Sequence, residues 1–261
     1  MPSTDDLEVV AAKLSRAGFV AAREEADELL IRARGNRDLL SELVERRLTG
    51  EPLAWITGSA LFCGRTIRVD SGVYVPRWQS EPLARRAVER LPANGLGIEI
   101  CTGSGAIART MMSARPGARI VATDIDGRAV ACAIANGVNA HRGDLFDPLP
   151  EGLEGVADVV VGVVPYVPTP ALSLLPSDTL VFESTLSYDG GDDGADLLRR
   201  AVTESARFLR HGGALLLELG GEQAEELQGE LTGIGYDDVI VLFDEDGDVR
   251  GIEATYGMHQ S

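Results

Sequence analysis

Lysine is almost absent from this chain of 261 residues, since Lys13 is its only one, and acidic residues outnumber basic residues by 41 to 24. The net charge of −17 repels a polyphosphate backbone, so we expect no nucleic acid as a direct partner. A lone lysine near the N-terminus leaves none for a Tyr/Lys proton-transfer pair or a Schiff base later in the chain. Two common kinds of enzyme chemistry are therefore disfavoured.

Cysteine is scarce as well, and long apolar runs are missing. Cys63, Cys101 and Cys132 are far apart and form no C-x-x-C pair, so we expect neither a disulfide framework nor a metal site. No apolar run approaches the roughly 18 residues of a membrane span. The N-terminus carries Asp5 and Asp6 where a targeting segment would be basic. These features predict a cytoplasmic protein with no membrane partner.

The most informative segment is Glu99-Ile-Cys-Thr-Gly-Ser-Gly-Ala106, which closes a strand-like apolar run and opens a helix-like one. Gly103 and Gly105 permit a tight turn and leave bare backbone against which an adenosine can lie. A second apolar run, beginning at Ala118, ends in Asp124, whose carboxylate can accept hydrogen bonds from both ribose hydroxyls. The order strand, glycine turn, helix, strand and acid predicts a nucleoside cofactor site.

The glycine pattern alone does not identify the cofactor. Gly103-Ser-Gly-Ala-Ile-Ala108 also fits the dinucleotide fingerprint, so a nicotinamide-dependent oxidoreductase stays open as an alternative. The shortage of lysine weighs against it, as do three histidines that occur in apparent loop or tail positions without a catalytic partner nearby in the sequence. The alternative predicts binding of a reduced dinucleotide.

A fourth strand-like run, Ala157 to Val164, leads directly into Pro165 and Tyr166 at the expected carboxyl edge of a sheet. With this loop, the chain resembles class I S-adenosylmethionine-dependent methyltransferases. More specifically, it resembles the protein-(glutamine-N5) methyltransferases that modify peptide chain release factors, the PrmC/HemK family. The resemblance covers nearly the whole chain and rests on Thr49-Gly-Glu-Pro-Leu-Ala-Trp-Ile-Thr-Gly58, Val75-Pro-Arg77, Thr102-Gly-Ser-Gly-Ala-Ile-Ala108, Gly143-Asp-Leu-Phe146, Asp189-Gly-Gly-Asp-Asp-Gly194 and Gly212-Gly-Ala-Leu-Leu-Leu-Glu-Leu-Gly220.

The resemblance implies that S-adenosyl-L-methionine is the cofactor and S-adenosyl-L-homocysteine the product. It implies that Asp144 accepts a hydrogen bond from the adenine amino group, that Leu145 packs on the adenine ring and that Glu99 holds the methionine ammonium. A plain turn at Gly143-Asp144 and a merely solvated Glu99 stay open as alternatives. The implied cofactor residues are Glu99, Cys101, Thr102, Gly103, Ser104, Gly105, Asp124, Ile125, Asp144, Leu145 and Val163.

The acceptor loop departs from the family, which carries Asn-Pro-Pro-Tyr where this chain has Val163-Val-Pro-Tyr166. The family asparagine holds the substrate amide nitrogen, and a valine side chain makes no such contact. We assign catalysis to Val164, Pro165 and Tyr166. Substrate binding is assigned to these three residues, Val163 and Arg77, although Arg77 can instead pair with the cofactor carboxylate or with Glu81. The alternative function is an S-adenosylmethionine-binding protein with another acceptor or with lost catalysis.

The periodicity predicts an α/β fold of the class I methyltransferase type: a Rossmann-like, mostly parallel, seven-stranded sheet ending in an antiparallel hairpin. We expect a helical substrate-docking domain over residues 1–52, a hairpin connector over 53–80 and the methyltransferase domain over 81–261. Among its elements are a helix over 194–210 and a strand over 214–219. The expected partner is a protein substrate such as a translation release factor.

Overall fold

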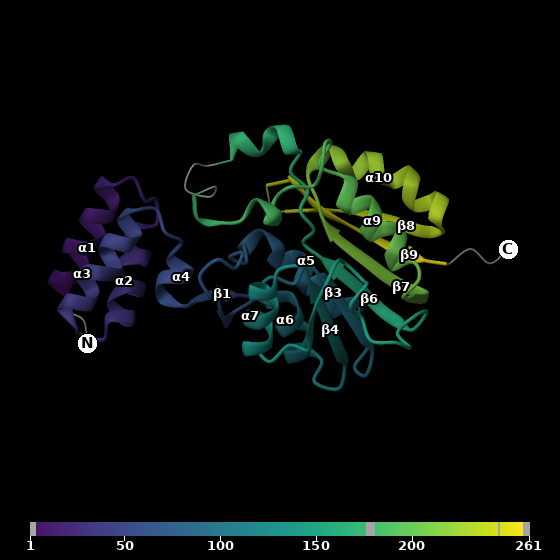
Figure 1. Cartoon of the computed structure of the whole chain (residues 1–261), viewed down its shortest axis with the longest axis horizontal. Helices are drawn as coiled ribbons and strands as arrows, with labels where there is room; N and C mark the ends of the chain where they lie inside the picture. The colour runs from purple at the N-terminus through teal and green to yellow at the C-terminus, as the bar shows by residue number, and fades with distance from the viewer. Residues whose placement is uncertain (1–3, 176–180, 245, 258–261) are drawn as a thin grey trace.

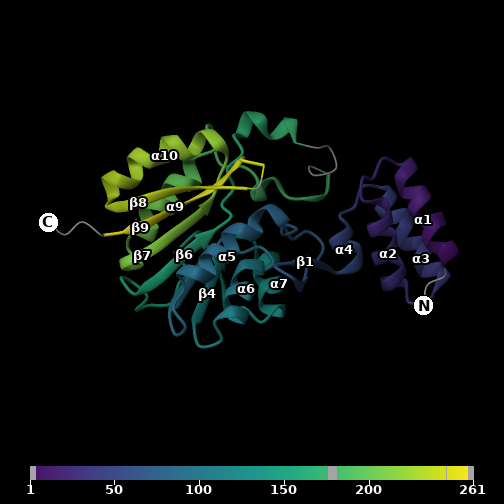
Figure 2. The ribbon, with the colours of Figure 1, turned by 180° about the vertical axis from the view of Figure 1, so that it is seen from behind.

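The computed structural model describes residues 4–175, 181–244 and 246–257. Residues 1–3 and 258–261, at the outer ends of the two expected terminal domains, lie outside these ranges. Figures 1 and 2 show the N-terminal helices at one end of the molecule, away from a sheet that is covered by helices on both faces. In the described part of the chain, no helix combines the length and apolar composition that a membrane crossing needs.

The N-terminal helices share a small apolar core of their own. They are α1 (Thr4–Arg16), α2 (Ala22–Ala33), α3 (Arg37–Leu48) and α4 (Leu53–Thr57). Leu14 and Leu29 are fully buried in this core. The Asn36 side chain caps α3 by accepting hydrogen bonds from two backbone amides. Arg47 of α3 pairs with Glu25 of α2 at 2.6 Å, which fixes the two helices side by side.

A hairpin follows these helices, as the sequence predicts. Strands β1 (Ser59–Phe62) and β2 (Arg65–Arg68) pair in antiparallel register. Cys63 and Gly64 between them have φ angles of 48° and 71°, and two successive left-handed residues make the tight turn that suits a hairpin. The connector also contains α4 and the 3₁₀ helix η1 (Trp78–Ser80), neither of which the hairpin interpretation anticipated.

The remaining chain alternates strands and helices around one seven-stranded sheet with the order β5-β4-β3-β6-β7-β9-β8. Its strands are β3 (Leu96–Ile100), β4 (Arg119–Asp124), β5 (Ala140–Arg142), β6 (Ala157–Gly162), β7 (Leu209–Glu218), β8 (Tyr236–Phe243) and β9 (Val249–Tyr256). Its helices are α5 (Glu81–Arg90), α6 (Ala106–Ala114), α7 (Gly127–Ala135), α9 (Asp196–Ser205) and α10 (Gly221–Ile234). Among the described residues of this sheet, β9 pairs antiparallel with both β7 and β8, and the other strand pairs are parallel, so the predicted fold class is confirmed.

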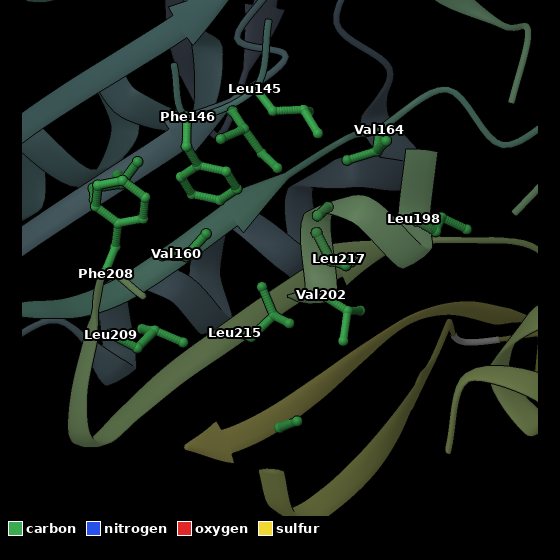
Figure 3. Packing of buried hydrophobic residues seen from close by; sticks show 14 of the residues in the cluster. Leu145, Phe146, Val160, Val164, Leu198, Val202, Phe208, Leu209, Leu215 and Leu217 are labelled. Carbon is green, nitrogen blue, oxygen red and sulfur yellow. The ribbon is translucent and has the colours of Figure 1, made fainter. Parts of the chain in front are cut away.

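Successive residues of the central strands point to opposite faces of the sheet, as strand geometry requires. Val160 of β6 and Leu215 of β7 pack beneath α9 and α10, whereas Val161 and Leu216 pack against the α5, α6 and α7 side. Figure 3 shows the first cluster, in which the rings of Phe146 and Phe208 stack with centroids 5.0 Å apart. Near-continuous apolar strands are therefore buried on both faces, as expected for a mostly parallel sheet.

The prediction of a helix over residues 194–210 was wrong at its carboxyl end. Helix α9 ends at Ser205, and β7 begins at Leu209 instead of near residue 214. Leu209 pairs with Ala157 of β6, and an irregularity in the register follows before Ala214 pairs with Val159. Sequence periodicity did not reveal this pairing, because tertiary contact between the buried Leu209 and β6 decides it.

Candidate functional site

A cavity of about 310 Å³ opens at the carboxyl ends of β3, β4 and β6. The chain proceeds from β3 outward to β4 and β5, and then returns to place β6 on the other side of β3. Such a switch point is where open α/β sheets bind ligands. Eleven of the predicted site residues line this cavity: Glu99, Cys101, Thr102, Gly103, Ser104, Asp124, Ile125, Asp144, Leu145, Val163 and Pro165.

The two glycines of the turn serve different purposes. Gly103 lines the cavity with a φ of +54°, and a Cβ added there would meet nothing within 4 Å, so bare backbone faces open space. Gly105 is not among the lining residues, which corrects the prediction that both glycines face the ligand. Its φ is +80°, and an added Cβ would lie 2.9 Å from Val138 and 3.1 Å from Ala133. Gly105 therefore allows close packing behind the turn.

Asp124 lies beside the glycine turn, as its position after the strand predicts. Its Oδ2 accepts a hydrogen bond from the Gly103 amide at 2.8 Å, and its Oδ1 accepts one from the Asp126 amide at 2.9 Å. Each carboxylate oxygen has a further lone pair, so both remain able to accept a hydroxyl. Burial raises the pKa of the Asp124 carboxyl, against the lowering effect of these amides.

Glu99 is a buried carboxyl at the opposite side of the turn. One of its oxygens accepts hydrogen bonds from the Thr102 hydroxyl and, at 3.1 Å, from the Ala108 amide. Burial raises the pKa of Glu99 to about 8. A group that costs so much to ionise without a partner is suited to a cationic ligand, because an adjacent positive charge would favour the carboxylate.

Asp144 and Leu145 line the cavity where the chain leaves β5. Asp144 is paired with Arg200 of α9 at 3.0 Å, so it is not simply a turn residue exposed to solvent. Leu145 is buried and has a φ of +40°, and Cys101, directly after β3, has a φ of +52°. A left-handed backbone conformation at a residue other than glycine costs on the order of 1–3 kcal/mol of conformational free energy. Such residues are concentrated at active sites and ligand-binding sites.

The four residues of the acceptor loop, which include the three predicted catalytic residues Val164, Pro165 and Tyr166, divide into two pairs. Val163 and Pro165 line the cavity, whereas Val164 and Tyr166 do not. The Val164 side chain is fully buried in the apolar cluster of Figure 3. The Tyr166 hydroxyl donates a hydrogen bond to Glu218 at 3.3 Å, and its carbonyl accepts one from Gln223. Tyr166 therefore anchors the loop, and Val163 and Pro165 are the residues of this loop that face the cavity.

Aromatic side chains that the sequence analysis did not select also line the cavity. They are Phe62, from the hairpin, and Tyr74, from the segment that follows it. The Tyr74 ring meets the Tyr188 ring edge to face, with centroids 5.7 Å apart, and burial raises the pKa of Tyr74 to about 12. The only signal in the sequence was the position of Tyr74 just before Val75-Pro-Arg77.

Arg77 has a partner other than either one predicted from the sequence. It pairs with the buried carboxylate of Glu183 at 2.6 Å, and Glu81 pairs instead with Arg85. Arg77 lies outside the lining of the main cavity and borders a second hollow between α4, β1 and the end of α3. The expected contact with Glu81 is therefore corrected, because Glu183, distant in sequence, reaches Arg77 through the fold.

The charges around the cavity favour a cationic donor. Five carboxyl groups line it, on Glu99, Asp124, Asp126, Asp144 and Asp189, and Arg200 is the single basic residue among the described lining residues. S-adenosylmethionine carries two positive groups, a sulfonium and an ammonium, and one negative carboxylate. A dinucleotide carries an anionic pyrophosphate instead. The residues present fit the former, with Gly103 open to the ligand and Asp124 and Glu99 on either side. Within the described ranges, no three metal-binding side chains gather in a way that could hold a metal ion.

Comparison with known proteins agrees with this geometry. A release factor glutamine methyltransferase from Moorella thermoacetica is 36% identical over 86% of this chain and 80% of its own. A 4-amino-L-phenylalanine/4-methylamino-L-phenylalanine methyltransferase from Streptomyces pristinaespiralis is 31% identical over 83% of this chain and 82% of its own. The solved ribosomal protein L11 methylase from Lactobacillus delbrueckii has a TM-score of 0.52 at 18% identity, over 73% of this chain and 85% of that one. No protein-family model matches the chain.

The fold, the acidic cavity and these likenesses define a class I S-adenosylmethionine-dependent methyltransferase, which confirms the predicted cofactor. The nicotinamide alternative finds no support here. Within the class, the chain belongs to the family of release factor glutamine methyltransferases.

Proposed function

We propose that this methyltransferase transfers a methyl group from S-adenosylmethionine to the side-chain amide nitrogen of a glutamine in a protein, with a translation release factor as substrate. The observation that carries this proposal is that the loop after β6 opens into the same cavity as Asp124 and Glu99. Val163 and Pro165 of this loop thus line one cavity with the two carboxyl groups proposed to hold the cofactor.

In this proposal each residue of the chain has a defined task. Asp124 accepts the ribose hydroxyls, Glu99 holds the ammonium, and the bound cofactor supplies an electrophilic methyl group. A backbone carbonyl of the cavity-lining residues Val163 and Pro165, in place of the buried Val164 predicted from the sequence, accepts a hydrogen bond from the acceptor amide, and Pro165 stiffens the loop. Alignment of nucleophile, methyl and leaving sulfur can lower the barrier by roughly 7–11 kcal/mol, while one polar contact contributes roughly 3–4 kcal/mol. The chemistry therefore tolerates the loss of the family asparagine, at a lower rate.

The direct test is transfer of labelled methyl groups to a purified bacterial release factor, with the modified residue located by peptide mass spectrometry. We expect one added methyl group on a glutamine side chain. Asp124→Ala should abolish both this transfer and saturable cofactor binding measured by isothermal titration. If the wild-type enzyme binds cofactor but modifies no glutamine of the release factor, the proposed acceptor is wrong.

The valine in the acceptor loop leads to a second, sharper prediction. Val163→Asn restores a side-chain amide that can hold the acceptor nitrogen, so kcat/KM for the release factor should rise up to roughly 100-fold, by analogy with single donors in oxyanion holes. Cofactor affinity should change little. Val163→Leu is the matched control, since it alters size without adding polarity. An equal gain in both variants would show that shape, not the amide contact, limits the rate.

Val163 also supports a second candidate function, transfer to an amine on a small aromatic molecule. An apolar Val163 and the Phe62 and Tyr74 side chains give the cavity a surface suited to an aromatic ring. The Streptomyces relative is named for such an acceptor. Incubation with 4-amino-L-phenylalanine distinguishes the two, because a release-factor enzyme should leave this amine unmodified.

We further propose the division into residues 1–52, 53–80 and 81–261, with the N-terminal helices docking the protein substrate in the cytoplasm. The separate apolar core of those helices supports a helical domain, and this core extends past residue 52 to Leu53 and Ile56 of α4. The hollow bordered by Arg47, Leu53, Leu61 and Arg77 lies where these helices meet the hairpin. Leu61 there is 72% exposed, which suits contact with a partner.

A further inference from the structure

Arg200 brings a positive charge to the wall of an otherwise acidic cavity. It lies on α9, three residues beyond Leu197, and both side chains line the cavity. Residues three apart share one face of a helix, so this face of α9 forms the wall beside Asp144.

The contacts of Arg200 hold its guanidinium in one orientation. Nη1 donates to both oxygens of Asp144, at 3.0 and 3.3 Å. The opposite edge contacts Glu204, one turn along the helix, with Nε at 3.1 Å and Nη2 at 3.0 Å. A planar guanidinium held along two edges gives a carboxylate a fixed direction, which a flexible ammonium would not do.

The backbone on either side of Asp144 is fixed as well. The Gly143 amide donates to the Asp124 carbonyl at 2.9 Å, which joins this loop to the end of β4. Leu145 holds the left-handed conformation with its side chain buried. The main-chain position of Asp144 is therefore fixed by β4 and the core, and the direction of its carboxylate is fixed by Arg200.

We propose that Arg200 is a positioning residue that determines which nucleobase the cofactor site accepts. By holding the Asp144 carboxylate in a fixed direction along the cavity wall, it makes that carboxylate an acceptor for an exocyclic amino group. A base with a carbonyl at the same position is rejected, because its carbonyl oxygen and the Asp144 carboxylate are both hydrogen-bond acceptors. Arg200 thereby specifies adenine over hypoxanthine, independently of which methyl acceptor the enzyme uses.

The test compares binding of S-adenosyl-L-homocysteine and S-inosyl-L-homocysteine by isothermal titration. These ligands have the same sugar and amino acid and differ at C6 of the base, where an amino group is replaced by a carbonyl, and at the adjacent N1, which then carries a proton. A hydrogen bond to a charged group corresponds to about 1.5–3 kcal/mol, so the wild type should prefer the adenine ligand at least roughly tenfold. Arg200→Met should weaken the adenine ligand by about that factor and change the hypoxanthine ligand less than about twofold.

Arg199→Met is the matched control. Arg199 neighbours Arg200 on α9, pairs with Asp193 and Glu230, and does not line the cavity. Both affinities should stay at wild-type values in this variant, and Glu204→Gln should keep most of the preference because the contact with Asp144 remains. Equal weakening of both ligands in Arg200→Met would indicate a structural role only and overturn the proposal. So would an unchanged preference in that variant, or a wild type that does not discriminate.

Discussion

At the scale of a single residue, the Glu99 carboxyl makes the affinity for the cofactor depend on pH. Its pKa of about 8, raised by burial, means that the free protein holds Glu99 protonated over much of the neutral range. An ammonium ligand prefers the ionised form, so binding releases a proton. Affinity for S-adenosylhomocysteine should therefore rise with pH, by up to about tenfold per unit, and level off above pH 8.

Titration calorimetry at several pH values measures this dependence directly. Glu99→Gln should bind more weakly and lose the rise, because the amide keeps the shape but cannot ionise. The free protein should show the opposite trend in stability: a carboxyl whose folded pKa is raised binds more protons folded than unfolded, so the free energy of unfolding falls as pH rises toward 8. A flat wild-type affinity profile would rule out Glu99 as the ammonium partner.

Sequence reasoning at this scale succeeded where a local rule sets the position. The glycine turn and the acid that ends the next strand locate Gly103 and Asp124, since neighbouring parallel strands end at one edge. It failed for Tyr166, whose hydroxyl is directed to Glu218 on a strand formed much later in the chain. It also missed Tyr74, which lines the cavity because the segment after the hairpin packs against α7, where Val73 shares a buried cluster with Ala129.

At the scale of elements, one buried carboxylate joins the segment before η1 to the loop that covers the cavity. Glu183 accepts hydrogen bonds from the Val75 amide at 3.1 Å and from Arg77 at 2.6 Å, and it also contacts the Tyr188 hydroxyl. The same loop supplies Ser184 and Leu186 to the cavity wall. The wall on this side therefore depends on contacts with the connector.

Glu183→Gln should lower the free energy of unfolding by roughly 1.5–3 kcal/mol, because the charged hydrogen bond to Arg77 is lost. Cofactor affinity should fall with it, since the loop would no longer be held against the cavity. Denaturant titration and calorimetry measure the two effects. Glu8→Gln is the control: Glu8 pairs with Arg23 with both side chains 59% exposed, and such pairs contribute about 0–1 kcal/mol. Equal losses in the two variants would contradict the assigned role.

Periodicity predicted the elements well where one face is buried and one is not, as in α1 with Leu14 on its apolar side. It misplaced the end of α9, because Phe208 and Leu209 continue an apolar pattern that a helix and a buried strand both satisfy. Only the pairing of Leu209 with Ala157 distinguishes the two, and that contact spans residues far apart in sequence.

At the scale of the whole molecule, the apolar core of the N-terminal helices is separate from the clusters that cover the sheet. Binding of cofactor and recruitment of a protein substrate should therefore be separable by mutation. Leu29 is fully buried in the helical core, and Leu198 is fully buried beside the cavity-lining Leu197. Leucine-to-alanine changes at such sites cost about 2–5 kcal/mol.

Leu29→Ala should leave the affinity for S-adenosylhomocysteine within about twofold of wild type, since its cost of about 2–5 kcal/mol falls on the N-terminal helices. The KM for the release factor should rise while that for a short glutamine-containing peptide stays unchanged, because only the whole protein needs the docking helices. Leu198→Ala should instead weaken cofactor binding, because it disturbs the cavity wall formed by α9, and it should leave docking of the release factor intact. Calorimetry with steady-state kinetics on both substrates separates these outcomes. Loss of cofactor binding in Leu29→Ala would mean that the two parts fold as one unit, and the proposed boundary at residue 52 would then have to be abandoned.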